Sequence, residues 1–125
     1  MKKQFLMVLA MVGAMTLVSP AALSHSDIKP QHGGVVHSKY DLSFELVREA
    51  DSVSLFVEDH GEPFATEQLT GQIMVLAGGK KSEVALTTAG VGKLTASALQ
   101  IPDGAKVVVT LTDKNKDMMT VRYSF

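Results

Sequence analysis

The feature that most constrains the fold is an alternation of apolar and polar residues with a period of two. Apolar side chains occupy every second position in segments 42–46, 53–57 and 107–111. Turn sequences such as Glu49-Ala50-Asp51 and Pro102-Asp103-Gly104 separate these segments. Short alternating runs between regular turns are typical of half-buried strands in an all-β domain. We therefore expect an antiparallel β-sandwich, an Ig-like or cupredoxin-like Greek key of about seven or eight strands. The pattern leaves the structure of 63–69 open, and one helical turn is compatible with it.

The N-terminus has the three-part layout of a cleaved signal peptide. Lys2 and Lys3 precede an apolar run over 5–18 and a small-residue segment over 19–24. This run is too short to span a bilayer comfortably. We expect cleavage after Ser24, with cuts after Ala21 and Ala22 as alternatives. The resulting organisation is a signal peptide at 1–24, a flexible histidine-containing arm at 25–34 and one β-sandwich domain at 35–125. The mature protein would then be periplasmic, with no membrane segment left.

Composition narrows the classes of function. Removing Lys2 and Lys3 from the twelve basic residues leaves ten against thirteen acidic ones, a formal charge of −3. Such a chain lacks the basic surface that nucleic-acid binding requires. It contains no cysteine, so disulfides, thiolate metal ligands and thiol nucleophiles are excluded. We also find no catalytic motif and expect that the protein is not an enzyme.

Histidines are the candidate metal ligands. His25, His32 and His37 fall within thirteen residues, and Pro30 and the Gly33-Gly34 pair between them allow the backbone to fold back. Two or three of these imidazoles could therefore converge on one ion, and imidazole suits copper, zinc and nickel alike. His32 is the strongest candidate because it lies next to the glycine pair. The alternatives are a solvated tail that happens to contain histidines and, for His37, an edge-strand position.

Two further positions could contribute to a metal site. His60 lies in an expected turn beside Asp59, whose carboxylate could orient the imidazole towards a metal, although a solvent-facing turn histidine is the simpler interpretation. In the mature chain, Met118 is expected on the face opposite Met119, and its thioether would favour Cu(I). Met119 and Met74 are expected to pack in the domain, Met74 together with Leu76.

The order of several short motifs resembles a known group of proteins. His32-Gly33-Gly34, then 43–47 (Ser-Phe-Glu-Leu-Val) and then 55–63 (Leu-Phe-Val-Glu-Asp-His-Gly-Glu-Pro) are similar to small periplasmic proteins associated with heavy-metal efflux. They are also similar to the N-terminal β-domain of periplasmic adaptor subunits of heavy-metal RND pumps. Glu62 replaces the lysine of that group's pattern, and the chain lacks the adaptors' coiled-coil and lipoyl-like segments.

This resemblance implies a metal-binding accessory protein that carries or buffers a transition metal, with an RND pump adaptor as its partner. Copper is the favoured ion, with zinc or cobalt as the other options. The alternative is a metal-independent β-sandwich interaction module that docks on an efflux adaptor or sensor.

Overall fold

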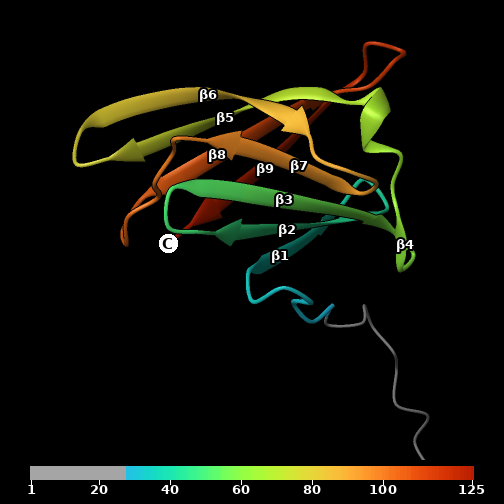
Figure 1. Cartoon of the computed structure of the whole chain (residues 1–125), viewed down its shortest axis with the longest axis horizontal. Coiled ribbons are helices and arrows are strands. Elements are labelled where there is room, and N and C mark those ends of the chain that lie inside the picture. Colours follow the sequence, from blue (N-terminus) through green and yellow to red (C-terminus); the bar gives the residue numbers. More distant parts are fainter. Residues whose placement is uncertain (1–27) are drawn as a thin grey trace, which may run out of the picture.

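The computed structural model describes residues 28–125. This part of the chain is built from strands and one 3-10 turn, all drawn in Figure 1. The expected signal peptide and His25 lie outside the described residues. In chain order, the elements are β1 Val35–Lys39, β2 Leu42–Arg48, β3 Ser52–Asp59, β4 Glu62–Pro63, η1 Thr66–Gln68, β5 Thr70–Ala77, β6 Lys80–Thr88, β7 Lys93–Ser97, β8 Lys106–Thr112 and β9 Met118–Ser124.

The strands form two antiparallel layers. The first layer has the order β1-β2-β3-β7, and the second has the order β6-β5-β8-β9. Strand β6 joins the layers, because Lys80–Leu86 pair with β5 while Thr87 and Thr88 pair with β7. The chain crosses between the layers after β4, after β6 and after β7, as it does in an Ig-like Greek key. In Figure 1, β1 and β6 lie at opposite edges of the molecule.

The outermost strands of the two layers, β1 and β9, are tied together at one end. The Lys39 Nζ donates a hydrogen bond to the Thr120 carbonyl at 2.8 Å. The Tyr40 hydroxyl accepts one from the Thr120 N–H at 3.1 Å. These bonds partly close the sandwich towards a barrel and fix the position of the β1–β2 turn.

The core lies between the layers and is supplied by alternate residues of each strand. On β2 and β3 the inward residues are those that the alternation predicts, because one face of each strand must be removed from water. The Tyr123 hydroxyl donates to the Phe44 carbonyl at 2.9 Å, so this buried polar group is satisfied. The fully buried side chains include Phe44, Leu46, Val53, Leu55, Val57, Ile73, Leu94, Val107, Val109, Leu111 and Tyr123.

The expected all-β antiparallel sandwich is confirmed, and a helical turn within 63–69 appears as η1. Residues 28–125 form nine strands where about seven or eight were expected, and the shortest of them is the two-residue β4. Met119 packs against the core and Met118 is exposed, as expected. The expectation for Met74 and Leu76 was wrong: Ile73 and Val75 face the core, and Leu76 is 41% exposed. Within residues 28–125, no helix has the length and hydrophobicity to span a membrane.

Candidate functional site

Residues 28–34, which we call the strap, lie over the outer face of the first layer and are held there by one carboxylate. Glu45 Oε1 accepts a hydrogen bond from the Gln31 N–H at 3.0 Å and contacts His32 Nδ1 at 3.0 Å. Glu45 Oε2 accepts from the N–H groups of His32 and Gly34, each at 2.8 Å. In this structure, the described part of the expected arm is bonded to β2 through the N–H groups of Gln31, His32 and Gly34.

Glu45 is unusual for a residue on the outer face of a strand, because its side chain is only 6% exposed. Burial raises the pKa of this carboxyl group by disfavouring the charge, but the hydrogen bonds outweigh burial. The bond from the His32 side chain and those from the N–H groups of Gly34, His32 and Gln31 hold the pKa of Glu45 below its usual value. The carboxylate is thus ionised at neutral pH and makes charge-assisted bonds to the strap.

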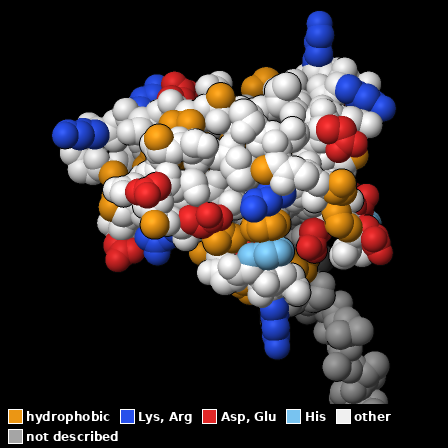
Figure 2. Space-filling model, viewed as in Figure 1, with side chains coloured by type: hydrophobic (Ala, Val, Ile, Leu, Met, Phe, Trp, Pro, Cys, Tyr) orange, Lys and Arg blue, Asp and Glu red, His pale blue; other side chains and the backbone are white. Residues whose placement is uncertain are grey.

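The His32 ring lies flat on the Phe56 ring, with 3.6 Å between centroids and 3° between planes. Phe56 pairs with Glu45 on β2 and with Lys93 on β7, so these three side chains share the outer face. The Lys93 Nζ lies 5.4 Å from the Phe56 ring centroid. On the face shown in Figure 2, a histidine side chain lies against hydrophobic side chains with a basic side chain beside them.

This arrangement sets the chemistry of the imidazole. Because Nδ1 faces a carboxylate, we assign the ring proton to Nδ1, which leaves the lone pair on Nε2. A carboxylate on one ring nitrogen fixes the ring orientation and raises the basicity of the other nitrogen, as at many metal-binding histidines. The side chain of His32 is 40% exposed. His32 therefore presents a pre-oriented, partly exposed imidazole on the outer face of the layer.

The two glycines after His32 serve different purposes. Gly33 has a φ of +75°, a left-handed conformation that turns the backbone so that the N–H groups of His32 and Gly34 both reach Glu45 Oε2. At Gly34 a Cβ atom would lie 2.4 Å from the Leu46 carbonyl oxygen, so only glycine allows the strap to approach β2 this closely.

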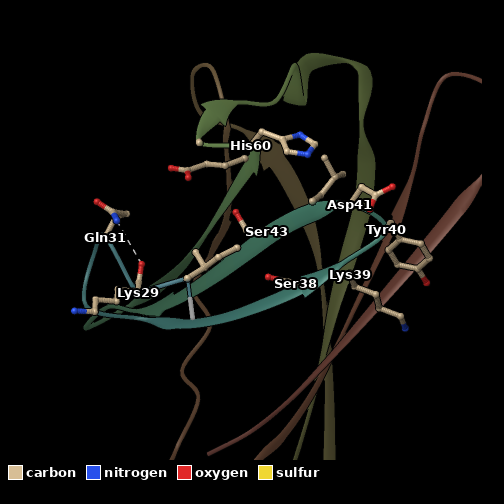
Figure 3. Close-up of a pocket in the computed structure, with 12 residues that line it drawn as sticks. Lys29, Gln31, Ser38, Lys39, Tyr40, Asp41, Ser43 and His60 are labelled. Atoms are coloured by element: carbon tan, nitrogen blue, oxygen red, sulfur yellow. Dashed lines mark hydrogen bonds between the residues drawn. The ribbon is translucent and has the colours of Figure 1, made fainter. Parts of the chain in front are cut away.

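Beside the strap lies an open groove of about 690 Å³, drawn in Figure 3. Its walls are the strap, the β1–β2 turn and the β3–β4 turn. Figure 3 shows Ser38 and Ser43 near its centre and His60 on the far wall. The lining residues are Ile28, Lys29, Gln31, Ser38, Lys39, Tyr40, Asp41, Leu42, Ser43, Glu58, His60 and Gly61.

Two walls of the groove are two-residue hairpin turns, at 40–41 and 60–61. Five non-glycine residues of the described chain have positive φ, and three of them, Tyr40, Asp41 and His60, line the groove. These are central residues of the two hairpin turns, where the twist of a two-residue hairpin requires positive φ at both positions. His60 Nδ1 contacts Asp59 Oδ1 at 2.5 Å, so this histidine also has a carboxylate on one ring nitrogen, as the sequence suggested.

The structure does not bring all the expected ligands together. His37 pairs with the buried Phe44 and its ring centroid lies 4.7 Å from that of Tyr123, so it belongs to the inner edge of the sandwich. His32 lies on the outer face of the same layer. The expectation that His32 and His37 converge on one ion is therefore not met, and His37 takes the edge-strand position that was the alternative.

The other expected ligands lie in different places. Met118 is 65% exposed at the start of β9, in the second layer. His60 and the strap residues Ile28, Lys29 and Gln31 line the same groove. Within residues 28–125, no group of three or more histidine, aspartate and glutamate side chains is arranged to hold a metal ion.

Sequence reasoning missed Glu45 and Phe56 as site residues. The only signal for Glu45 was its place in the motif 43–47, where alternation marks it as an outward and ordinarily exposed residue. Nothing in the local pattern indicates that a segment eleven to fourteen residues earlier folds back to cover it.

Comparisons with known proteins do not assign the chain to a family. No protein-family model matches the sequence. No curated protein matches it either. A solved structure titled "Crystal structure of Br derivative BhCBM56" is similar over 74% of this chain and 100% of that chain, with 15% sequence identity and a TM-score of 0.45. A similarity at this level carries no argument about function.

Proposed function

We propose that the protein is a periplasmic transition-metal-binding accessory protein that carries or buffers an ion for a heavy-metal efflux system. The observation that carries this proposal is the presentation of His32: Nδ1 lies against a buried carboxylate, the ring is stacked on Phe56, and the side chain is 40% exposed. Copper is the favoured ion, since imidazole sites bind Cu(II) more tightly than other divalent first-row metals; zinc and cobalt are the further options.

The site proposed is open rather than closed. His32 supplies one ligand, and His25, separated from the strap by only two residues in the sequence, is proposed as a second ligand. His60 with Asp59 is proposed as a second, separate nitrogen ligand on the groove wall. Sites with few protein ligands leave positions for water or for a partner's ligands, and this suits a carrier that must release its ion.

The test is a titration of the mature protein with Cu(II), Zn(II) and Co(II), followed by native mass spectrometry. The variant His32→Phe keeps an aromatic ring on Phe56 and the three backbone N–H bonds to Glu45, but it removes the nitrogen ligand. We expect this variant to weaken metal affinity at least tenfold. The matched control is His37→Phe, which changes a histidine on the inner side of β1 and should leave the affinity unchanged. Equal affinity in wild type and His32→Phe would refute the proposal.

Periplasmic localisation and cleavage are tested separately, by recovering the protein from the periplasmic fraction of cells. Mass spectrometry of the protein recovered from the periplasm reports the mature N-terminus, and a mass beginning at His25 would establish cleavage after Ser24.

The second candidate function is an interaction module that docks on an RND adaptor or sensor without a metal. The groove favours it, because a cavity of about 690 Å³ between the strap and two hairpin turns is a feature that a metal ion does not need. A pull-down by the adaptor distinguishes the two functions. Under the second function, metal-free protein and His32→Phe are retained as well as the metal-loaded wild type.

A further inference from the structure

We infer that the groove beside the strap is a binding site for a linear diamine or polyamine, a small organic cation with an ammonium group at each end. This inference goes beyond the proposed metal function and does not depend on it, because His32 is not among the residues that line the groove. It rests on the register of three strands, on a buried hydroxyl without a partner and on the unpaired charges around the groove.

The floor of the groove is a row of polar side chains across three neighbouring strands. In the β-ladders, Ser43 on β2 pairs with Ser38 on β1 and with Glu58 on β3. Directly opposed residues of an antiparallel sheet project from the same face, with Cβ atoms about 4.5–5.5 Å apart. All three residues line the groove. Two hydroxyls and a carboxylate, all able to accept hydrogen bonds, therefore lie side by side at its base.

Ser43 is the residue that points to a ligand. Only 9% of it is exposed, yet within residues 28–125 its hydroxyl makes no hydrogen bond. No fully enclosed side-chain oxygen in this part of the chain lacks a partner, so the Ser43 hydroxyl must open onto the groove. Figure 3 shows it pointing there. A buried hydroxyl is costly without a hydrogen bond, and a ligand N–H directed at this oxygen would supply one.

The unpaired charges of the groove are mainly negative. Glu58 on the floor and Asp41 in the β1–β2 turn form no salt bridge with a residue of the described chain. The Lys39 ammonium is already bonded to the Thr120 carbonyl at 2.8 Å. In Figure 3 the ammonium of Lys29 lies at the end of the groove farthest from Asp41. The groove between them therefore favours a cation.

The shape of the groove favours a long organic cation over a metal ion. Within residues 28–125 no three histidine or carboxylate side chains are arranged to hold a metal. A volume of about 690 Å³ lies in the range of sites that take small organic ligands. Ile28 and Leu42 line it and offer apolar contact to methylene groups. Asp41 and Glu58 belong to different walls, so each can make a charge-assisted hydrogen bond to one end of an alkyl diamine.

The experiment is a titration of the isotope-labelled mature protein with putrescine, the four-carbon diamine, at low ionic strength, followed by amide NMR. The matched probes are n-butylamine and the four-carbon diol, which keep the chain and remove one or both charges. We expect putrescine to shift the groove amides with half-saturation at or below about 1 mM. The monoamine should bind about fivefold more weakly and the diol about twentyfold more weakly. Added salt should weaken putrescine binding, because it screens the charges.

Three variants test the residues that carry the inference. Glu58→Gln removes a charge at nearly constant size and should weaken putrescine binding about fivefold. Asp41→Asn should weaken it about threefold, and asparagine tolerates the φ of +58° at this position. Ser43→Ala should weaken it about threefold without loss of stability, because the hydroxyl has no partner in the described chain. Asp51→Asn is the matched control: it makes the same change in the turn at the other end of β2, and affinity should not change.

Four results would overturn the inference. The first is that about 10 mM putrescine leaves the groove amides unshifted. The second is that the diol binds as tightly as putrescine, since the groove would then recognise hydroxyl groups and not charges. The third is equal binding of n-butylamine, which would indicate a site for a single ammonium group such as a partner's lysine side chain. The fourth is that Asp51→Asn weakens binding as much as Glu58→Gln, which would mean attraction to the acidic surface as a whole.

Discussion

Gly34 provides a sharp test of how the strap is held, because the structure leaves no room for a side chain there. A Cβ on Gly34 would lie 2.4 Å from the Leu46 carbonyl oxygen and 2.9 Å from both the Leu46 carbonyl carbon and Val47 Cγ2. The φ of Gly34 is not positive, so the backbone itself would accept alanine. Where there is room for the side chain, such a glycine-to-alanine change stabilises a protein by about 0.4–1 kcal/mol, because it lowers the conformational entropy of the unfolded chain.

The size of the effect follows from which group has to move. Leu46 belongs to β2, which is paired on both sides by β1 and β3, so its carbonyl is fixed and the strap must lift instead. Lifting breaks the Gly34 N–H bond to the Glu45 carboxylate, worth about 1.5–3 kcal/mol for a bond to a charged group. After the gain from the unfolded state, we expect Gly34→Ala to lower the free energy of unfolding by about 1–2 kcal/mol.

The assay is urea denaturation followed by circular dichroism, and the neighbouring glycine supplies the control. Gly33 has a φ of +75°, and a Cβ added there would meet no atom within 4 Å, so its need for glycine is conformational rather than steric. Asparagine tolerates this conformation, and Gly33→Asn should therefore cost less than about 1 kcal/mol. The account of the strap would be refuted if Gly34→Ala were as stable as the wild type. It would also be refuted if Gly33→Asn lowered the free energy of unfolding more than Gly34→Ala does.

Three further outcomes test the rest of the fold. The chain has two tyrosines, and their absorbance near 295 nm should titrate in two steps: the hydrogen bond with the Thr120 backbone lowers the pKa of Tyr40, whereas burial raises that of Tyr123. The pKa of Tyr123 is higher in the folded than in the unfolded protein, so the contribution of Tyr123 to stability is complete below about pH 10 and is lost as pH rises further. The variant Tyr40→Phe should remove only the titration step at lower pH. Tyr123→Phe should lower the unfolding free energy by about 1–2 kcal/mol in urea, since the Phe44 carbonyl loses its buried donor. Leu55→Ala should cost about 2–5 kcal/mol in the same assay, because Leu55 is fully buried between the layers, and a smaller loss would mean a looser core.

The fold was largely accessible from the sequence because it depends on local alternation. The inward residues of β2 and β3 follow from period-two hydrophobicity, and so does the contrast between Met119 and Met118. Alternation failed on β5, where residues 73–76 are all apolar and only the tertiary packing decides that Ile73 and Val75 face inward. A continuous apolar run contains no information about which face of a strand is buried.

The site was less accessible because it depends on contacts between segments far apart in the chain. His32 and His37 are close in the sequence, which suggested one shared ion. The start of β1 at Val35 lies between them, so His37 follows the strand to the inner edge while His32 folds back over the outer face. The burial of Glu45 has the same origin, since it depends on where the strap returns and not on the pattern within β2.

The geometry nevertheless defines a pattern that can be sought in a sequence. Two N–H groups on either side of Gly33 converge on Glu45 Oε2 only if that glycine turns left-handed, and Gly34 must lack a side chain to approach Leu46. The carboxylate must then lie on the outer face of β2, eleven residues after Gly34 and directly before Leu46. His-Gly-Gly is therefore half of a structural unit, and an acidic residue at this later position is the other half. A chain with the first half alone would present a histidine whose ring and backbone have no common anchor, and its strap amides should exchange with solvent faster than those of this chain.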